Sequence, residues 1–213
     1  MPFEIGDVRI LLIRLAIMVV AISIHEFAHA ITADALGDST ARRYGRVTLN
    51  PVSHFDPLGF LMLIFLVVFG FGFAWGRPVP VNPYALRGGR RGMALVAFAG
   101  PLSNLVQAAV AVAIWRAMGT PHPGDSMLPM ILWTFAYLNV LLAAFNMLPV
   151  PPLDGFNVLM GLVSDFWVQR LEPLRQYGPV LLLLLIFLGG RFIFDYTVIP
   201  MFELFAWLVG LRA

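Results

Sequence analysis

Residues Val8–Ala35 read VRILLIRLAIMVVAISIHEFAHAITADA, an apolar segment that carries the cluster His25-Glu26-x-x-His29. A membrane span needs about 20 mostly apolar residues, and this segment is longer than that. Placing one ionisable side chain at mid-bilayer costs at least about 2.5–3.5 kcal/mol. Three such side chains within five positions therefore indicate a buried functional site on a membrane helix.

The composition supports a lipid environment for the whole chain. Of 213 residues, 60% are hydrophobic and 12% are charged, whereas soluble domains have about 45–50% and about 25%. We expect a single integral-membrane domain over residues 1–213, with a core at 8–165 and C-terminal helices at 178–213. The net charge is +2 and all basic residues are arginines scattered in short loops. This pattern gives no basic stripe for nucleic acid.

Apolar segments alternate with turn-rich loops along the chain. The predicted membrane segments are Val8–Ala35, Leu58–Trp75, Met93–Met118, Met127–Leu148 and Val180–Phe194, with an apolar tail at Phe202–Leu211. The predicted fold is an all-α polytopic membrane protein with about five to six membrane segments. The arginine-bearing loops 37–57 and 76–92 contain β-branched runs at Arg46–Leu49 and Pro78–Val81. We expect short strands or turns there.

The spacing of the first motif suits a metal. Residues four apart lie on one face of an α-helix, so His25 and His29 can bind one ion through a nitrogen each. Glu26 lies beside them, where it can take a proton from water. Zinc accepts nitrogen and oxygen ligands in tetrahedral geometry, and the chain has no cysteine to offer. The alternative is a polar hydrogen-bond cluster between helices.

Asp154 is the candidate for a third ligand. It follows a proline-rich run at 149–152 and precedes Gly155, so its backbone is irregular. Irregular backbone at membrane depth is tolerated where it is buried in protein or lines a wet cavity. The alternative is that Asp154 caps a helix over Gly155–Val163, since aspartate is a preferred N-cap residue.

Three motifs occur in this order: His25-Glu26-x-x-His29, Gly100-Pro101-x-x-Asn104 and Asn146-x-x-Pro149-x-x-Pro152-Leu153-Asp154-Gly155. Together with Gly37-Asp38 and Asn50-Pro51 they resemble the site-2 protease family of intramembrane zinc metalloproteases. The resemblance covers about residues 20–160 and the motifs are highly specific. The chain corresponds to a compact form of the family, without PDZ or CBS modules.

The resemblance implies roles for individual residues. His25, His29 and Asp154 would hold one Zn²⁺ per chain, and Glu26 would be the general base. Asn146 would contact the substrate near the metal. The partners would be transmembrane protein substrates within the lipid bilayer, and the reaction would be regulated intramembrane proteolysis. The oligomeric state is not given by the sequence.

Two further polar residues have open roles. His54 precedes Asp56-Pro57 in a turn, so it either lines the site and supports a ligand or is a local hydrogen-bond partner. Asn104 lies within an apolar segment, where it either orients a ligand or bonds across helices.

The proposed metal site constrains the topology. The first and fourth segments must end on the same side, which predicts that Leu58–Trp75 re-enters without crossing. One face then carries the loop arginines Arg42, Arg43, Arg46, Arg77, Arg87, Arg90, Arg91, Arg170 and Arg175, and the other carries Arg9, Arg14 and Arg116. By the positive-inside rule the arginine-rich face is cytoplasmic. We expect a prokaryotic inner-membrane protein with its active site nearer that face.

Two other classes of function remain as alternatives. A catalytically silent homologue would bind membrane proteins without cleaving them, but it would not need Glu26 as a base. A metal transporter would carry ionisable residues along a path through the membrane, whereas the later segments have few.

Overall fold

The computed structural model describes residues 8–69 and 74–210, and the regular structure in these ranges is entirely helical. The α-helices are α1 (Val8–Ala35), α2 (Thr40–Arg43), α3 (Pro57–Phe69), α4 (Arg90–Ala117), α5 (Met127–Asn146), α6 (Asp154–Leu162), α7 (Asp165–Leu171), α8 (Gly178–Ile193) and α9 (Ile199–Leu208). Two 3₁₀ turns cover Pro51–His54 and Glu172–Tyr177, and a π-helical turn covers Phe194–Val198. The predicted all-α membrane fold is confirmed.

Of the short strands or turns expected in these loops, no strand forms in the described residues. The first run has bends at Val47 and Thr48, and Pro78–Val81 is irregular. The carbonyls of Arg77 and Pro78 accept hydrogen bonds from the guanidinium of Arg46 instead of from a neighbouring strand. Proline also has no N–H to contribute to a ladder, which disfavours pairing through the second run.

Among the described residues, four helices are long and apolar enough to cross a membrane: Val8–Ala35, Arg90–Ala117, Met127–Asn146 and the continuous stretch Asp165–Gly190. The segment predicted at Leu58–Trp75 is shorter. Its helix α3 is described over 13 residues, and the chain is irregular from Ala74, while residues 70–73 lie outside the described ranges. Since a span needs about 20 residues, α3 is too short to cross upright.

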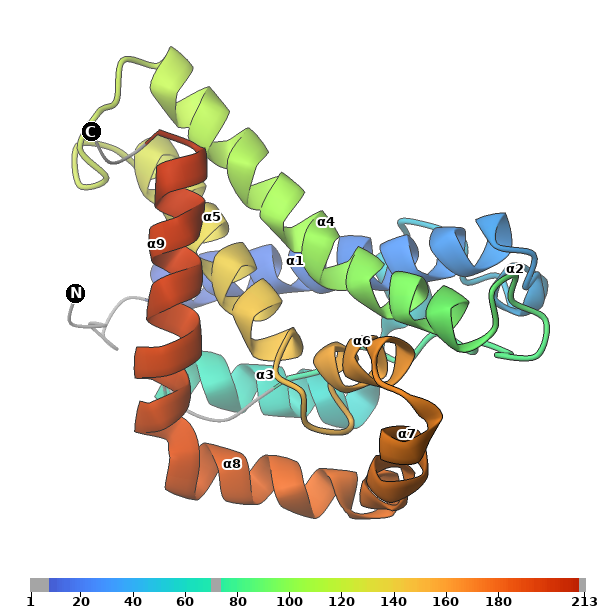
Figure 1. Ribbon diagram of the computed structural model, residues 1–213. Coiled ribbons are helices and arrows are strands. Elements are labelled where there is room, and N and C mark those ends of the chain that lie inside the picture. The colour runs from blue at the N-terminus through green and yellow to red at the C-terminus, as the bar shows by residue number, and fades with distance from the viewer. Residues whose placement is uncertain (1–7, 70–73, 211–213) are drawn as a thin grey trace.

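Helix α4 is the centre of the molecule, and Figure 1 shows it running diagonally across the other helices. Its most extensive contacts are with α5, α1 and α6. Small residues let these backbones approach closely. The cluster shared by α4, α5 and α9 consists of Ala108, Ala111, Val112, Ala136, Val140 and Phe205.

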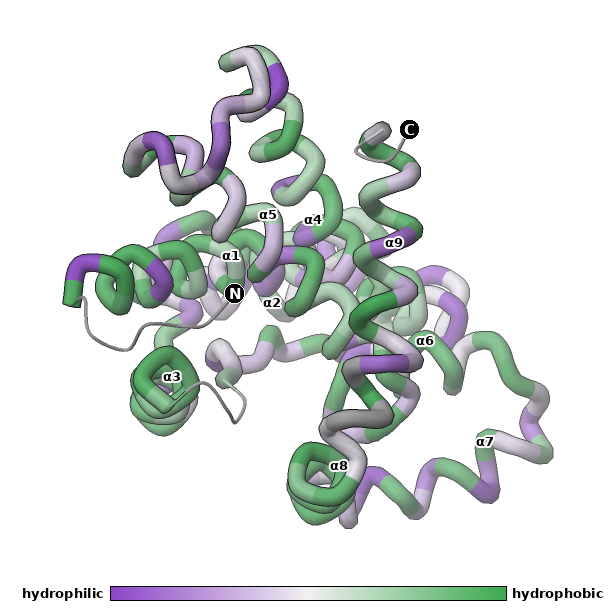
Figure 2. The backbone as a smooth tube through the Cα atoms, turned by 90° about the vertical axis from the view of Figure 1, so that its left-hand side faces the viewer, coloured by the Kyte–Doolittle hydropathy of each residue, from purple (hydrophilic) through white to green (hydrophobic). Residues whose placement is uncertain are grey.

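Helices α3 and α8 lie at the periphery. Figure 2 views both end-on and colours them mostly as hydrophobic. Many of their large side chains are exposed, including Leu58 and Leu61 on α3 and Phe187 and Leu188 on α8. A helix that is apolar all round is typical of a protein core or a membrane, so these exposed apolar side chains agree with the membrane fold.

The loop after α1 is fixed by a buried carboxylate. Asp38 is 0% exposed. It accepts hydrogen bonds from the backbone N–H and hydroxyl of Thr40 and from the backbone N–H of Asn82. Burial opposes ionisation, but these bonds outweigh it and hold the pKa of Asp38 below its ordinary value. The carboxylate thereby ties the segment 74–82 to the end of α1.

Replacing Asp38 with Asn should loosen this segment. The NH₂ group of the new asparagine would face one of the N–H or O–H groups that now donate to Asp38. Leaving a buried donor unsatisfied lowers the free energy of unfolding by about 1–3 kcal/mol. Limited proteolysis in detergent should cut 74–82 faster, and the melting temperature should fall. Because the native pKa is depressed, the wild type keeps this stabilisation above the ordinary value of 3.8 and loses it as the pH falls further. Equal proteolysis rates for both proteins would contradict the assigned role.

Candidate metal centre

The two histidines and Asp154 converge at one point although they are far apart in sequence. His25 and His29 lie on α1, and Asp154 is the first residue of α6. The Nε2 atoms are 3.0 Å apart, and Oδ2 of Asp154 lies 3.1 Å from His25 Nε2 and 3.3 Å from His29 Nε2. Both histidines are 8% exposed. With the half-buried Asp154 they form a three-residue group that can hold a metal ion.

The Nδ1 atoms of the two imidazoles, which face away from the shared space, are each hydrogen-bonded to an acceptor. His29 Nδ1 lies 2.7 Å from the backbone carbonyl of Val96, and His25 Nδ1 lies 2.7 Å from Oδ1 of Asn104. A carbonyl only accepts, so Nδ1 carries the proton in each ring. In a neutral imidazole the Nε2 lone pair then points at the shared space. Metal-binding histidines commonly donate their second N–H in this way.

These residues fit a tetrahedral zinc ion. Two nitrogen lone pairs and a carboxylate oxygen crowd one point, and Oδ2 of Asp154 is buried without a hydrogen-bond partner of acceptable geometry. A cation removes this repulsion. Zinc ligands at about 2.0–2.1 Å are separated by about 3.3 Å in a tetrahedron, close to the observed spacings. The alternative polar cluster would require a second proton on a buried imidazole.

Two glycines permit the close approach of the helices that carry the metal-type ligands. A Cβ on Gly100 of α4 would lie 2.5 Å from Cε1 and Nε2 of His29 and 2.6 Å from Cε1 of His25. A Cβ on Gly155 would lie 2.2 Å from the carbonyl oxygen of Met147. Larger residues would separate α4 from α1 and would move α6 away from the end of α5. Both glycines are therefore required by close contact.

Asp154 does not serve as the N-cap of α6. The N-cap position is Leu153, which makes no side-chain capping bond. The helix begins one residue earlier than predicted, and its first carboxylate faces the histidines. The structure thus favours the ligand interpretation of this residue over the capping one.

Glu26 lies next to the cluster but outside the three-residue group. Its side chain packs against Gly76, where a Cβ would lie 3.3 Å from Oε1 of Glu26. The adjoining backbone is anchored by Arg46, which is 5% exposed and binds the carbonyls of Ser53, Arg77 and Pro78. Arg46 is therefore a buried structural residue and not a solvated loop arginine.

The remaining candidate residues differ in their positions. Asn104 is fully buried and contacts His25. Asn146 is the last residue of α5, and its amide donates to the carbonyl of Leu142 at 3.0 Å. His54 is buried, with Nε2 2.8 Å from the carbonyl of Thr48. This contact lies within its own loop and not among the metal-type ligands.

Sequence reasoning missed two contributors to the site. The carbonyl of Val96 has no signature in the sequence because any residue carries one. Asn139 on α5 contacts Asn104. In the sequence it could have been noticed as a single amide residue within an apolar segment. Such residues in membrane helices usually bond between helices.

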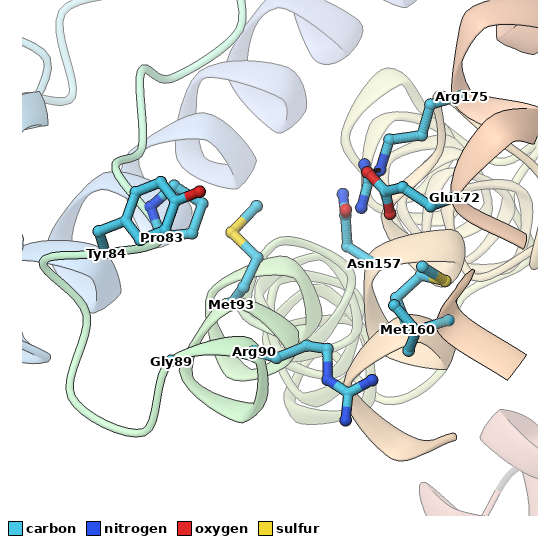
Figure 3. A pocket seen from close by; sticks show the side chains of 10 residues that line it. Pro83, Tyr84, Gly89, Arg90, Met93, Asn157, Met160, Glu172 and Arg175 are labelled. Carbon is cyan, nitrogen blue, oxygen red and sulfur yellow. Dashed lines mark ion pairs between the residues drawn. The ribbon is translucent and has the colours of Figure 1, made fainter. Parts of the chain in front are cut away.

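A separate cavity of about 400 Å³ lies between α4, α6 and the α7 region. Figure 3 shows Met93 and Arg90 on one side of it and Asn157, Met160, Glu172 and Arg175 on the other. None of the three metal-type ligands lines it. Asn157 is three residues beyond Asp154, so the cavity begins about one helical turn from the metal centre.

Comparisons with known proteins agree with this geometry. The chain is 35% identical over 173 residues to "Putative zinc metalloprotease YwhC" of Bacillus subtilis, covering 79% of this chain and 77% of that protein. Residues 118–187 match the model for peptidase family M50.

The chain belongs to peptidase family M50.

Two further relatives have lower identity. "Putative zinc metalloprotease Rip2" of Mycobacterium tuberculosis is 32% identical over 173 residues, which are 78% of this chain and 63% of that protein. Rip2 of Mycolicibacterium smegmatis is 29% identical over 84% of this chain and 68% of its own length. No solved structure matches. Membership of M50 confirms the resemblance to site-2 proteases and supports a metalloprotease embedded in a membrane.

Replacing Gly100 with Ala should abolish the metal centre, because the new methyl group would occupy the space of both imidazoles. We expect the zinc affinity of the purified protein to fall by at least about 10–100-fold, as for damaged supporting contacts. Elemental analysis and chelator competition would measure this. Gly190→Ala is the matched control, since a Cβ there meets nothing within 4 Å on α8. Equal zinc affinity in the Gly100 and Gly190 variants would refute the steric argument.

Proposed function

We propose that this M50 protein is an intramembrane zinc metalloprotease that hydrolyses peptide bonds within or next to transmembrane segments. The observation that carries the proposal is the convergence of His25, His29 and Asp154 at 3.0–3.3 Å on apolar elements. We assign these three residues as ligands of one Zn²⁺ per chain. When bound, zinc lowers the pKa of water from about 15.7 to about 7 and polarises a carbonyl.

Glu26 is assigned as the general base. Its carboxylate accepts a proton from the attacking water, whose oxygen bonds to the carbonyl carbon of the substrate. As the C–N bond breaks, Glu26 passes the proton to the leaving amine nitrogen. One amide N–H of Asn146 donates to the backbone carbonyl of Leu142. We assign its second N–H as a donor to the substrate carbonyl.

The substrates are transmembrane proteins, and their helices must open before cleavage. A helix engages its carbonyls in its own hydrogen bonds, so the scissile bond becomes accessible only after local unwinding. We place the protein in a prokaryotic inner membrane with the arginine-rich loops in the cytoplasm, following the positive-inside rule. This orientation puts the catalytic centre nearer the cytoplasmic face.

The first test compares the wild type with Glu26→Gln in liposomes. Glutamine keeps the shape but cannot accept the proton, so cleavage of a model single-span substrate should fall by about 10²–10⁴-fold. Zinc content should stay near one per chain in both proteins. Zinc in both with cleavage in neither would favour a silent homologue. Absence of zinc in the wild type would restore the polar-cluster interpretation.

Substrate opening gives a second test. Two glycines near the cleavage site should raise the cleavage rate by about fivefold each, because each weakens a helix by about 1 kcal/mol. The control carries the same glycines at the far end of the span. Equal acceleration at both places would show that unwinding at the cleavage site does not limit the rate.

A further inference from the structure

A file of hydrogen-bonded buried side-chain amides, Asn104 on α4 and Asn139 on α5, connects α5 to the metal centre. His25 Nδ1 lies 2.7 Å from Asn104 Oδ1, and Asn104 Nδ2 donates to Asn139 Oδ1 at 2.8 Å. Asn139 Nδ2 in turn donates to the backbone carbonyl of Phe135 at 3.0 Å. Both asparagines are 0% exposed.

The direction of every bond in this file follows from its last member. The carbonyl of Phe135 can only accept, so Asn139 must turn its NH₂ group toward it and its oxygen toward Asn104. Asn104 must then present its NH₂ group to Asn139 and its oxygen to His25. This leaves His25 to donate from Nδ1. Side-chain amides are often ambiguous in orientation, but here a backbone carbonyl resolves both.

We propose that Asn139 is a positioning residue that, through Asn104, fixes His25 with its proton on Nδ1 and its Nε2 lone pair toward the metal centre. The inference rests on the proposed role of His25 as a ligand. The hydrogen bonds of Asn139 go to Asn104 and Phe135 and not to His25, His29 or Asp154. It acts by setting which way Asn104 faces.

Comparison with Gln107 separates this role from general burial of an amide. Gln107 lies one turn beyond Asn104 on α4 and is 9% exposed. Neither its Oε1 nor its Nε2 has a hydrogen-bond partner. Without Asn139, the NH₂ group of Asn104 would keep only a weak bond to the carbonyl of Ala21 at 3.5 Å. Asn104 could then rotate and offer its NH₂ group to His25.

The test is nitrogen NMR of the metal-free protein with ¹⁵N-labelled histidine. In the wild type the Nδ1 atom of His25 should carry a proton. In Asn139→Leu a second population without that proton should appear, and zinc affinity should fall by about 10–100-fold. Asn139→Asp in its protonated form should restore both properties, because its O–H can donate to the carbonyl of Phe135 while its other oxygen accepts from Asn104.

Gln107→Leu is the matched control, since it removes a buried amide from the same region without touching the file. It should leave the His25 signal and the zinc affinity unchanged. A wild-type His25 with Nδ1 unprotonated would overturn the proposal without any variant. So would Asn139→Leu with wild-type zinc affinity. If the wild type binds no zinc, the proposed function fails, while the NMR result still reports on the file.

Discussion

The structure depends on the cost of placing His25, Glu26 and His29 on a membrane helix. Each side chain must find a partner inside the protein, because lipid offers none. Each imidazole donates from Nδ1 to an acceptor on α4 and directs its Nε2 at Asp154. Four elements of the fold are thereby held in one register: α1 supplies the rings, α4 their acceptors, α6 the carboxylate, and α5 the amide behind them.

Close packing makes this register possible. Gly100 leaves room for both imidazoles, and Gly155 lets α6 begin directly against the end of α5. Alanines line the contact between α4 and α5. Apolar driving force between helices is absent in lipid, so van der Waals contact and buried hydrogen bonds must provide the specificity. The site and the helix packing are therefore the same set of contacts.

The sequence predicted the helices and the identity of the converging residues well, because hydropathy and the i, i+4 spacing of His25 and His29 are local signals. The short strands expected at Arg46–Leu49 were wrong, because β-branched residues there carry no information about a pairing partner. The carbonyl of Val96 was invisible for a related reason: backbone acceptors have no side-chain signature. Asn139 was visible as a residue, but its direction of hydrogen bonding depends on Phe135, which only the packed helix reveals.

Helix α3 has a consequence for the surrounding bilayer. The helix begins at Pro57 and the chain is irregular at Ala74, so a helix between them has at most 17 residues and extends at most about 26 Å, whereas the hydrocarbon core is about 30 Å thick. Lipid beside α3 must thin, or the helix must tilt within one leaflet. In the first case, the path from bulk water to the interior of the protein would be shorter beside α3. In either case the fit of α3 depends on the thickness of the hydrocarbon core, so membranes of different acyl-chain length are different solvents for this protein.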